Sequence, residues 1–227
     1  MTDLAPHGIV TALHIGTSGW SYPSWRGGFY PADAKPDGFL RFYAERFDTV
    51  ELNTTGYRLP GEAQFDRWAE QAPPGFRFAP KMPPQGLRDV ATFEQRVGRL
   101  GDRLGPIRVV VQSARDEGLL ELLLGSVDPD LRYAFDFRHA SWDGLETRIF
   151  AAGCTCVGAT SADAPFLYLR FRDPPYDDGA LVEAAAAARS YLDAGTDVYC
   201  YFRHEDAPTA PAYAARVREL VGSSLQL

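Results

Sequence analysis

Short runs of alternating hydrophobic and polar residues recur along the chain and predict eight β-strands. In such a run every second side chain faces a hydrophobic layer, which is typical of strands rather than helices. The predicted strands are residues 14–18, 49–53, 76–81, 107–112, 133–138, 154–159, 166–172 and 198–203. Helical periodicity fills most of the intervals, at residues 38–47, 62–71, 93–104, 116–124, 145–152, 180–194 and 210–221.

The alternation of strands and helices predicts a parallel sheet, because a helix is the usual crossover between parallel neighbours. Eight such units in 227 residues fit a (β/α) barrel of the TIM type, and this length leaves little room for a second domain. We therefore predict an α/β fold with a single barrel domain over residues 1–227, in which residues 1–12 form a loose N-terminal extension.

One connection departs from this pattern. Residues 160–165 (TSADAP) join the sixth and seventh runs and are too few for the crossover that two parallel neighbours require. Either one strand there runs antiparallel, or the sixth run is not a full barrel strand.

Polar side chains gather at the C-terminal ends of the predicted strands. In the second run Val50 and Leu52 share the apolar face, which leaves Glu51 and Asn53 pointing into the barrel. The other runs divide in the same way into an apolar face and an inward face, and Trp20 and Tyr57 follow just after the first two strands. The candidate site residues are therefore Ser18, Trp20, Glu51, Asn53, Tyr57, Lys81, Gln112, Asp136, Arg138, Arg170, Arg172 and Arg203. Barrel active sites are built at this end, so the ring predicts one central pocket.

The ring is cationic although the protein is acidic. Its lysine and arginines exceed its two carboxylates by three charges, whereas the chain carries a net charge of −7. A cationic pocket in an acidic protein predicts a small anionic ligand as partner, such as a phosphate or carboxylate. The alternative is that the strand-end charges form structural ion pairs that close the barrel mouth. Because the chain has 21 Arg and only 2 Lys, Lys81 is the more informative cation.

Three members of the ring are candidate catalytic residues. Glu51 and Asp136 lie three strands apart and could act as general acid and base, or as a glycosidase-like pair. Lys81 is a candidate electrostatic stabiliser of the anion, or an imine-forming amine if burial lowers its pKa. The other members are assigned to substrate binding, with Arg138 and Arg170 holding the anion together with Lys81.

Composition disfavours several other classes of protein. The chain opens without a basic segment and apolar run, and no stretch approaches the length of a membrane span, so we expect a cytoplasmic protein with no membrane partner. The 3 cysteines lack the spacing of a disulfide framework or zinc site, and the 4 histidines form no metal-binding motif. No metal and no other cofactor is predicted. The acidic charge also makes nucleic acid an unfavoured partner.

Three motifs resemble the YecE-like family, also known as domain of unknown function 72. They are residues 15–20 (IGTSGW), 49–53 (TVELN) and 76–83 (FRFAPKMP), in the order of that family's first three strands. The resemblance implies a TIM-type barrel, irregular and with a mixed sheet around strands 6 and 7. Five positions match the family pattern, namely Glu51, Asn53, Lys81, Arg138 and Arg170.

The chain departs from the family pattern at the rim of the expected pocket. The departures are Thr55-Gly56, Asp136 in place of Glu, Arg172-Asp173, and residues 203–205 (RHE). They put in doubt a ligand shared with the relatives, and the family label carries no established reaction.

Three hypotheses about function follow. The leading one is an enzyme that acts on a small anionic, phosphorylated or sugar-containing substrate by acid–base chemistry, with Glu51 as general base or acid and Asn53 orienting the substrate. The second is a non-catalytic protein that binds a metabolite or the end of a nucleic acid in the same pocket. The third, by analogy with other barrels, is a metal-dependent nuclease.

Overall fold

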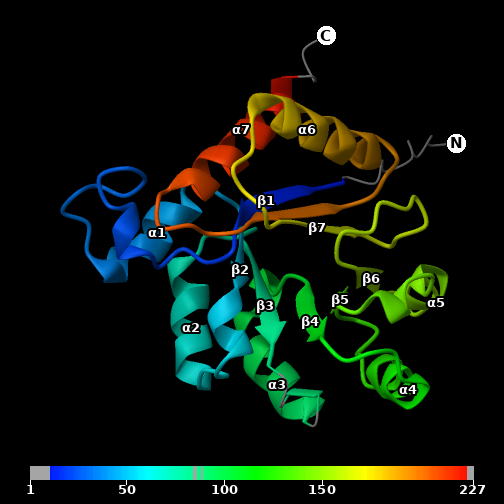
Figure 1. The fold of residues 1–227 in the computed structure, drawn as a ribbon. Coiled ribbons are helices and arrows are strands. Elements are labelled where there is room, and N and C mark those ends of the chain that lie inside the picture. Colours follow the sequence, from blue (N-terminus) through cyan, green and yellow to red (C-terminus); the bar gives the residue numbers. More distant parts are fainter. Residues whose placement is uncertain (1–10, 84–85, 88, 224–227) are drawn as a thin grey trace, which may run out of the picture.

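The computed structural model describes residues 11–83, 86–87 and 89–223 (Figure 1). The strands are β1 (Leu13–Thr17), β2 (Thr49–Leu52), β3 (Arg77–Met82), β4 (Ile107–Val111), β5 (Tyr133–Phe137), β6 (Thr155–Cys156), β7 (Leu167–Phe171) and β8 (Val198–Phe202). The α-helices are α1 (Phe39–Ala44), α2 (Glu62–Gln71), α3 (Val90–Val97), α4 (Glu117–Gly125), α5 (Glu146–Ala151), α6 (Asp178–Asp193) and α7 (Thr209–Ser223). Each predicted strand and helix has a counterpart here.

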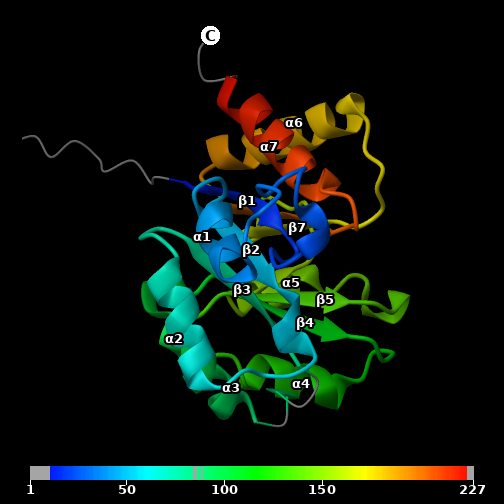
Figure 2. The same cartoon turned by 90° about the vertical axis from the view of Figure 1, so that its left-hand side faces the viewer.

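The eight strands form one sheet that curves into a nearly closed barrel. Their order is β6-β5-β4-β3-β2-β1-β8-β7, and each of the registers between neighbouring described strands is parallel. Helices lie around the outside, with α6 and α7 side by side over β1, β7 and β8 (Figures 1 and 2). The predicted TIM-type barrel is therefore confirmed.

The prediction of a mixed sheet around strands 6 and 7 is wrong. Every strand pair in the described chain is parallel, and β6 and β7 are the two ends of the sheet rather than a paired ladder. β6 spans only two residues, and the backbone amide of Gly158 just beyond it donates to the carbonyl of Tyr168 in β7 at 2.9 Å. A strand this short does not need a full helical crossover, so the sixth run is an incomplete barrel strand.

Two apolar clusters occupy the two faces of the sheet. Between the sheet and the helices, Val50 and Leu52 of β2 and Phe78 of β3 are buried. Inside the barrel lies a smaller cluster made of Ala79, Ala134, Phe166, Tyr168, Tyr199 and Tyr201. The interior is thus a packed core. Polar side chains cover it at both ends: the predicted ring lies at the C-terminal ends of the strands, and His14 and Arg132 contact Tyr199 at the N-terminal ends.

Aspartates fix the starts of three helices that follow the strands. Asp89, Asp116 and Asp177 each precede a helix and accept a hydrogen bond from the backbone amide three residues on. Such a cap satisfies an amide that has no partner within the helix, and it is worth about 1 kcal/mol. The caps begin α3, α4 and α6 at the end of the barrel where the polar ring lies.

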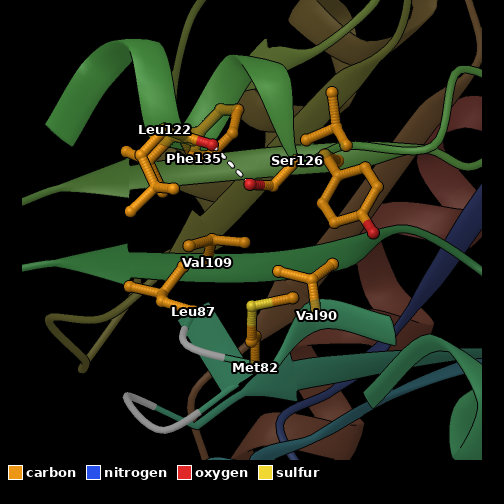
Figure 3. Close-up of a pocket in the computed structure, with 10 residues that line it drawn as sticks. Met82, Leu87, Val90, Val109, Leu122, Ser126 and Phe135 are labelled. Carbon is orange, nitrogen blue, oxygen red and sulfur yellow. Dashed lines mark hydrogen bonds between the residues drawn. The ribbon is translucent and has the colours of Figure 1, made fainter. Parts of the chain in front are cut away.

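A small apolar hollow lies outside the sheet, between α3 and α4 (Figure 3). Met82, Val109 and Phe135 line it from three neighbouring strands, and Val90 and Leu122 line it from the two helices. Its volume of about 10 Å³ leaves room for little more than one water molecule. We therefore read it as a packing gap in the helical layer rather than a ligand site.

The N-terminal end of the described chain is attached to the barrel by hydrogen bonds. The hydroxyl of Thr11 donates to the carbonyl of Leu192, and the amide of Ala12 donates to Asp197, so these two residues of the expected extension are tied to the barrel. Residues 1–10 lie outside the described part of the chain. In that part, no helix is long and apolar enough to cross a membrane.

Candidate functional site

Arg108 lies at the centre of the barrel mouth, between the two carboxylates of the polar ring. Its Nη1 donates to Glu51 Oε1 at 3.1 Å, and its Nη2 donates to Asp136 Oδ2 at 2.6 Å. All three side chains are almost fully buried. The space between the two carboxylates is filled by a guanidinium group, which leaves no room there for the sugar that a glycosidase-like pair would have to flank.

Asp136 is surrounded by guanidinium groups. Besides Arg108, both Arg138 and Arg172 donate to the same oxygen, Oδ2, at 2.9 and 2.8 Å. Arg138 and Arg172 are partly exposed, at 36% and 25% of their side-chain surface, so they reach from the buried carboxylate out to solvent. One carboxylate oxygen therefore orients two arginines that a ligand can reach.

Glu51 is held in a similar way on the opposite side of Arg108. The hydroxyl of Tyr168 donates to Oε1 at 2.8 Å, and Nε of Arg170 lies 3.0–3.1 Å from both oxygens. Burial alone would raise the pKa of Glu51, but the charges of Arg108 and Arg170 and the Tyr168 hydroxyl hold it below its usual value. Glu51 is therefore an ionised anchor, and a weak base.

Lys81 lies beside this network without a carboxylate partner in the described chain. Its backbone amide and carbonyl are both bonded to the hydroxyl of Thr55, at 3.0 and 2.8 Å, which fixes the end of β3. The Lys81 ammonium lies 5.2 Å from the ring centre of Tyr57, which is 82% exposed. Burial and the nearby charge of Arg108 lower the pKa of Lys81.

A groove opens next to the network, above the ends of β1 and β2 and beside α2. Its volume is about 640 Å³, within the range of small-molecule sites. Glu51 and Asn53 line its inner side, Trp20 and Trp68 supply indole rings, and Gln64 projects from α2. Asn53 also accepts a hydrogen bond from Arg108 at 3.4 Å, so groove and network share a wall.

A second hollow of about 540 Å³ lies on the β7–β8 side of the mouth and is lined by Arg172 and Arg203. Tyr22 of the groove and His204 of this hollow stack on each other, 4.4 Å apart and with their planes 13° from parallel. Ser18 supports this stack, because its hydroxyl accepts from the His204 amide at 3.1 Å and its carbonyl accepts from the Tyr22 hydroxyl. The stack separates the two hollows.

The structure brings most of the sequence-predicted residues together, but not all. Gln112 and Arg203 follow the ends of their strands and are exposed, and the Arg203 guanidinium donates only to the carbonyl of Arg172 among the described residues. The first loop uses its aromatic residues mainly for packing, since Trp25 and Tyr30 are buried and the hydroxyl of Tyr30 donates to the carbonyl of Trp20.

Arg108 and Tyr168 are the site residues that the sequence prediction missed. Both share the inward parity of their strands, Arg108 with Gln112 and Tyr168 with Arg170. The prediction covers strand ends, whereas both side chains lie deeper inside the barrel. An arginine on the inner face of a strand was the signal that could have been used, since it must find carboxylates there.

Within the described residues, no three His, Cys, Asp or Glu side chains come close enough together to hold a metal ion. The site's polar groups are dominated instead by guanidinium and ammonium donors. Four arginines and Lys81 surround two carboxylates, which leaves three positive charges unbalanced. Such an arrangement attracts anions.

Comparisons with known proteins agree with the motifs. The family model described as "Protein of unknown function DUF72" matches residues 14–227. The UPF0759 protein YecE of Escherichia coli K12 is 31% identical over 140 residues, covering 56% of this chain and 48% of YecE. The YecE protein of strain O157:H7 gives the same values. The chain thus spans about half the length of these curated relatives.

Two solved structures have the same fold. A DUF72 family protein of Enterococcus faecalis V583 superposes with a TM-score of 0.76 at 15% identity, covering 93% of this chain and 98% of that one. A DUF72 family protein of Thermotoga maritima MSB8 gives a TM-score of 0.74 at 22% identity, covering 92% and 99%. At these identities the likeness shows the fold alone. The resemblance predicted from the three motifs is confirmed.

Proposed function

The chain belongs to the DUF72 family, and from this premise we propose that it binds a small molecule through a phosphate or carboxylate group at the mouth of the barrel. The family description and the names of the relatives carry no activity, so the proposal stands on the side chains of the site. The anionic group is held by Arg138, Arg170 and Arg172, with Lys81 beside them.

The observation that carries the proposal is the convergence of three guanidinium groups on one oxygen of Asp136. A single carboxylate balances only one of these charges. Nε of Arg172 is buried and has no hydrogen-bond partner among the described residues, which costs free energy unless a ligand or water accepts a hydrogen bond from it. An anion between Arg138 and Arg172 would neutralise the excess positive charge and accept hydrogen bonds from N–H groups that have no other partner.

As the leading form of this function we propose an enzyme in which Lys81 carries the chemistry. Because its pKa is lowered, Lys81 more readily takes the neutral form, which can accept a proton or attack a carbonyl group. Glu51 and Asp136, which the sequence suggested as acid and base, are assigned here to positioning the arginines, because guanidinium groups cover both.

The second candidate is binding without turnover. The burial of both carboxylates favours it, since Glu51 lines the 640 Å³ groove but is paired with Arg108 and Arg170. In this case a metabolite would be recovered unchanged from the complex, and substitution of Lys81 would weaken binding without removing any product.

Calorimetry with inorganic phosphate, sulfate and a panel of phosphorylated and carboxylated metabolites tests the proposal. We expect saturable binding that falls by about tenfold or more in Arg138→Ala and Arg172→Ala, because each change removes a charge-assisted hydrogen bond. Arg189→Ala is the matched control, since Arg189 pairs with Asp193 on the outer helix α6.

Product analysis of each bound metabolite, in the wild type and in Lys81→Met, separates the enzyme from the binding protein. Absence of binding across the whole panel would overturn the proposal. So would binding that Arg138→Ala and Arg172→Ala leave at the wild-type affinity.

A further inference from the structure

The 640 Å³ groove beside the arginine network has the chemistry of a sugar-binding site. We propose that it holds the neutral ring of a phosphorylated sugar whose phosphate lies on the arginines. The inference rests on the proposed function, because the arginines fix one end of the ligand. It goes beyond that function by assigning a second subsite and a substrate class.

The groove combines flat aromatic surface with hydrogen-bonding side chains. Trp20 and Trp68 meet edge to face, with ring centres 5.5 Å apart, and Trp68 remains partly exposed at the groove. The C–H face of a sugar ring packs on such aromatic rings, while its hydroxyl groups need donors and acceptors at the ring's edge.

Polar groups are available at that edge. Gln64 uses its carbonyl oxygen to accept from Arg67 at 2.6 Å, which leaves its amide hydrogens as donors toward the groove. The guanidinium group of Arg58, also at the groove, is exposed and makes no hydrogen bond or ion pair with any described residue. These donors suit hydroxyl oxygens rather than an apolar ligand.

The groove and the network are joined closely enough for one small molecule. Glu51 and Asn53 line the groove, and the same two side chains contact Arg170 and Arg108 of the network at 3.0 and 3.4 Å. A phosphate above Arg170 therefore lies one side chain away from the groove wall. A ring attached directly to that phosphate enters the groove, whereas inorganic phosphate leaves it empty.

The test compares ligands that share a phosphate and differ in the ring. Calorimetry would measure inorganic phosphate, glycerol 3-phosphate, ribose 5-phosphate and glucose 1-phosphate against the wild type, Trp68→Leu and Gln64→Leu. We expect at least one cyclic sugar phosphate to bind about tenfold more tightly than inorganic phosphate. Both substitutions should remove that advantage without changing the affinity for inorganic phosphate.

Trp68→Leu and Gln64→Leu differ in how far they can disturb the fold. Trp68 also packs on Phe65 and Phe78, so its substitution can disturb the fold, whereas Gln64 is partly exposed and its replacement leaves the core intact. Gln71→Leu, at the other end of α2 and outside the groove, is the matched control. Tryptophan fluorescence gives an independent readout, because a ring over Trp68 changes the emission and inorganic phosphate does not.

The outcomes distinguish this inference from the proposed function. If every phosphate ligand binds with equal affinity in the wild type and in both groove variants, the groove is not a sugar site while the anion site stands. If no phosphate ligand binds, or if Arg138→Ala leaves the affinity for phosphate ligands unchanged, the proposed function fails and the inference fails with it.

Discussion

The guanidinium group of Arg108 donates two hydrogen bonds to a single oxygen of Asp136, from Nε at 2.9 Å and from Nη2 at 2.6 Å. Both side chains are buried, with relative exposures of 2%. Arg108 also reaches Glu51, so two buried anions share one buried cation at the top of the barrel core. The exposed arginines of the site take their positions from this pair.

Loss of the Arg108 side chain should destabilise the barrel strongly. Arg108→Met leaves two buried carboxylates without their shared cation, and removal of one partner from a buried ion pair costs about 3–5 kcal/mol. Urea unfolding followed by circular dichroism at neutral pH would measure this loss. Arg189→Ala, which breaks an ion pair on the outside of α6, should leave the midpoint nearly unchanged. A mild effect for Arg108→Met would mean that the network contributes little to folding.

Glu51 should make the stability of the protein sensitive to acid. Its pKa is lower in the folded than in the unfolded protein, so its contribution is complete above the unfolded value of about 4.5 and is lost as the pH falls through the folded value. Glu51→Gln removes this contribution. The free energies of unfolding of wild type and variant should therefore differ most at neutral pH and converge in acid.

The measurement for Glu51 is a series of urea titrations from neutral to acidic pH. Glu183→Gln serves as the control, because Glu183 is an exposed carboxylate on the outer helix α6 and lies outside the network. A constant difference between Glu51→Gln and the wild type over the whole series would contradict the assignment of Glu51 as an ionised anchor.

The fold could be predicted from the sequence because its signal is local and repeated. The alternation at Val50, Glu51 and Leu52 recurs in the other strands, and a parallel barrel follows from eight such units separated by helices. The error concerned the short connection before β7. A sequence pattern does not report how many residues of a run form a ladder, and only the pairing of β6 with β5 shows that this strand has two.

Many members of the candidate site could be predicted from the sequence, but the contacts between them could not. Parity places Glu51 and Asp136 inside the barrel, yet it says nothing about what lies between them. Arg108 fills that space and contacts both carboxylates, which is why we propose that they anchor arginines rather than act as acid and base. Contacts across a barrel join residues far apart in the chain, so they depend on tertiary packing rather than on any local pattern.

Lys81 should make anion binding depend on pH. Its pKa is lowered in the free protein by burial and by Arg108, and a bound anion favours the charged amine. Affinity should therefore be highest below the free-state pKa and fall as the pH rises through it. Sulfate is the suitable probe, because its own charge is constant over this range.

Three proteins give different curves in that experiment. Lys81→Met should bind sulfate more weakly at neutral pH and lose the decline at high pH. Lys81→Arg should keep the affinity and also lose the decline, since a guanidinium group stays charged. If Lys81→Met shows the same decline as the wild type, a group other than Lys81 is responsible for the pH dependence.

Gly56 should control the position of Lys81. A methyl group added at Gly56 would lie 2.4 Å from Cδ and 2.8 Å from Cε of Lys81, so the lysine stem has to move. The clash involves a flexible side chain and no backbone atom, and Gly56→Ala should therefore change the stability by less than about 1 kcal/mol. It should lower the sulfate affinity toward that of Lys81→Met.

A double-mutant cycle makes this prediction specific. If Gly56→Ala acts by displacing the Lys81 amine, it has no further effect on sulfate binding once Lys81 is methionine, so the two changes are not additive. Gly38→Ala is the matched control, because a methyl group there meets no atom within 4 Å. Full additivity would mean that Gly56 acts on the arginines or on the β2–α2 loop instead. The non-additive result would tie the amine of Lys81 to the anion, because Gly56→Ala would then act on sulfate binding only when the lysine is present.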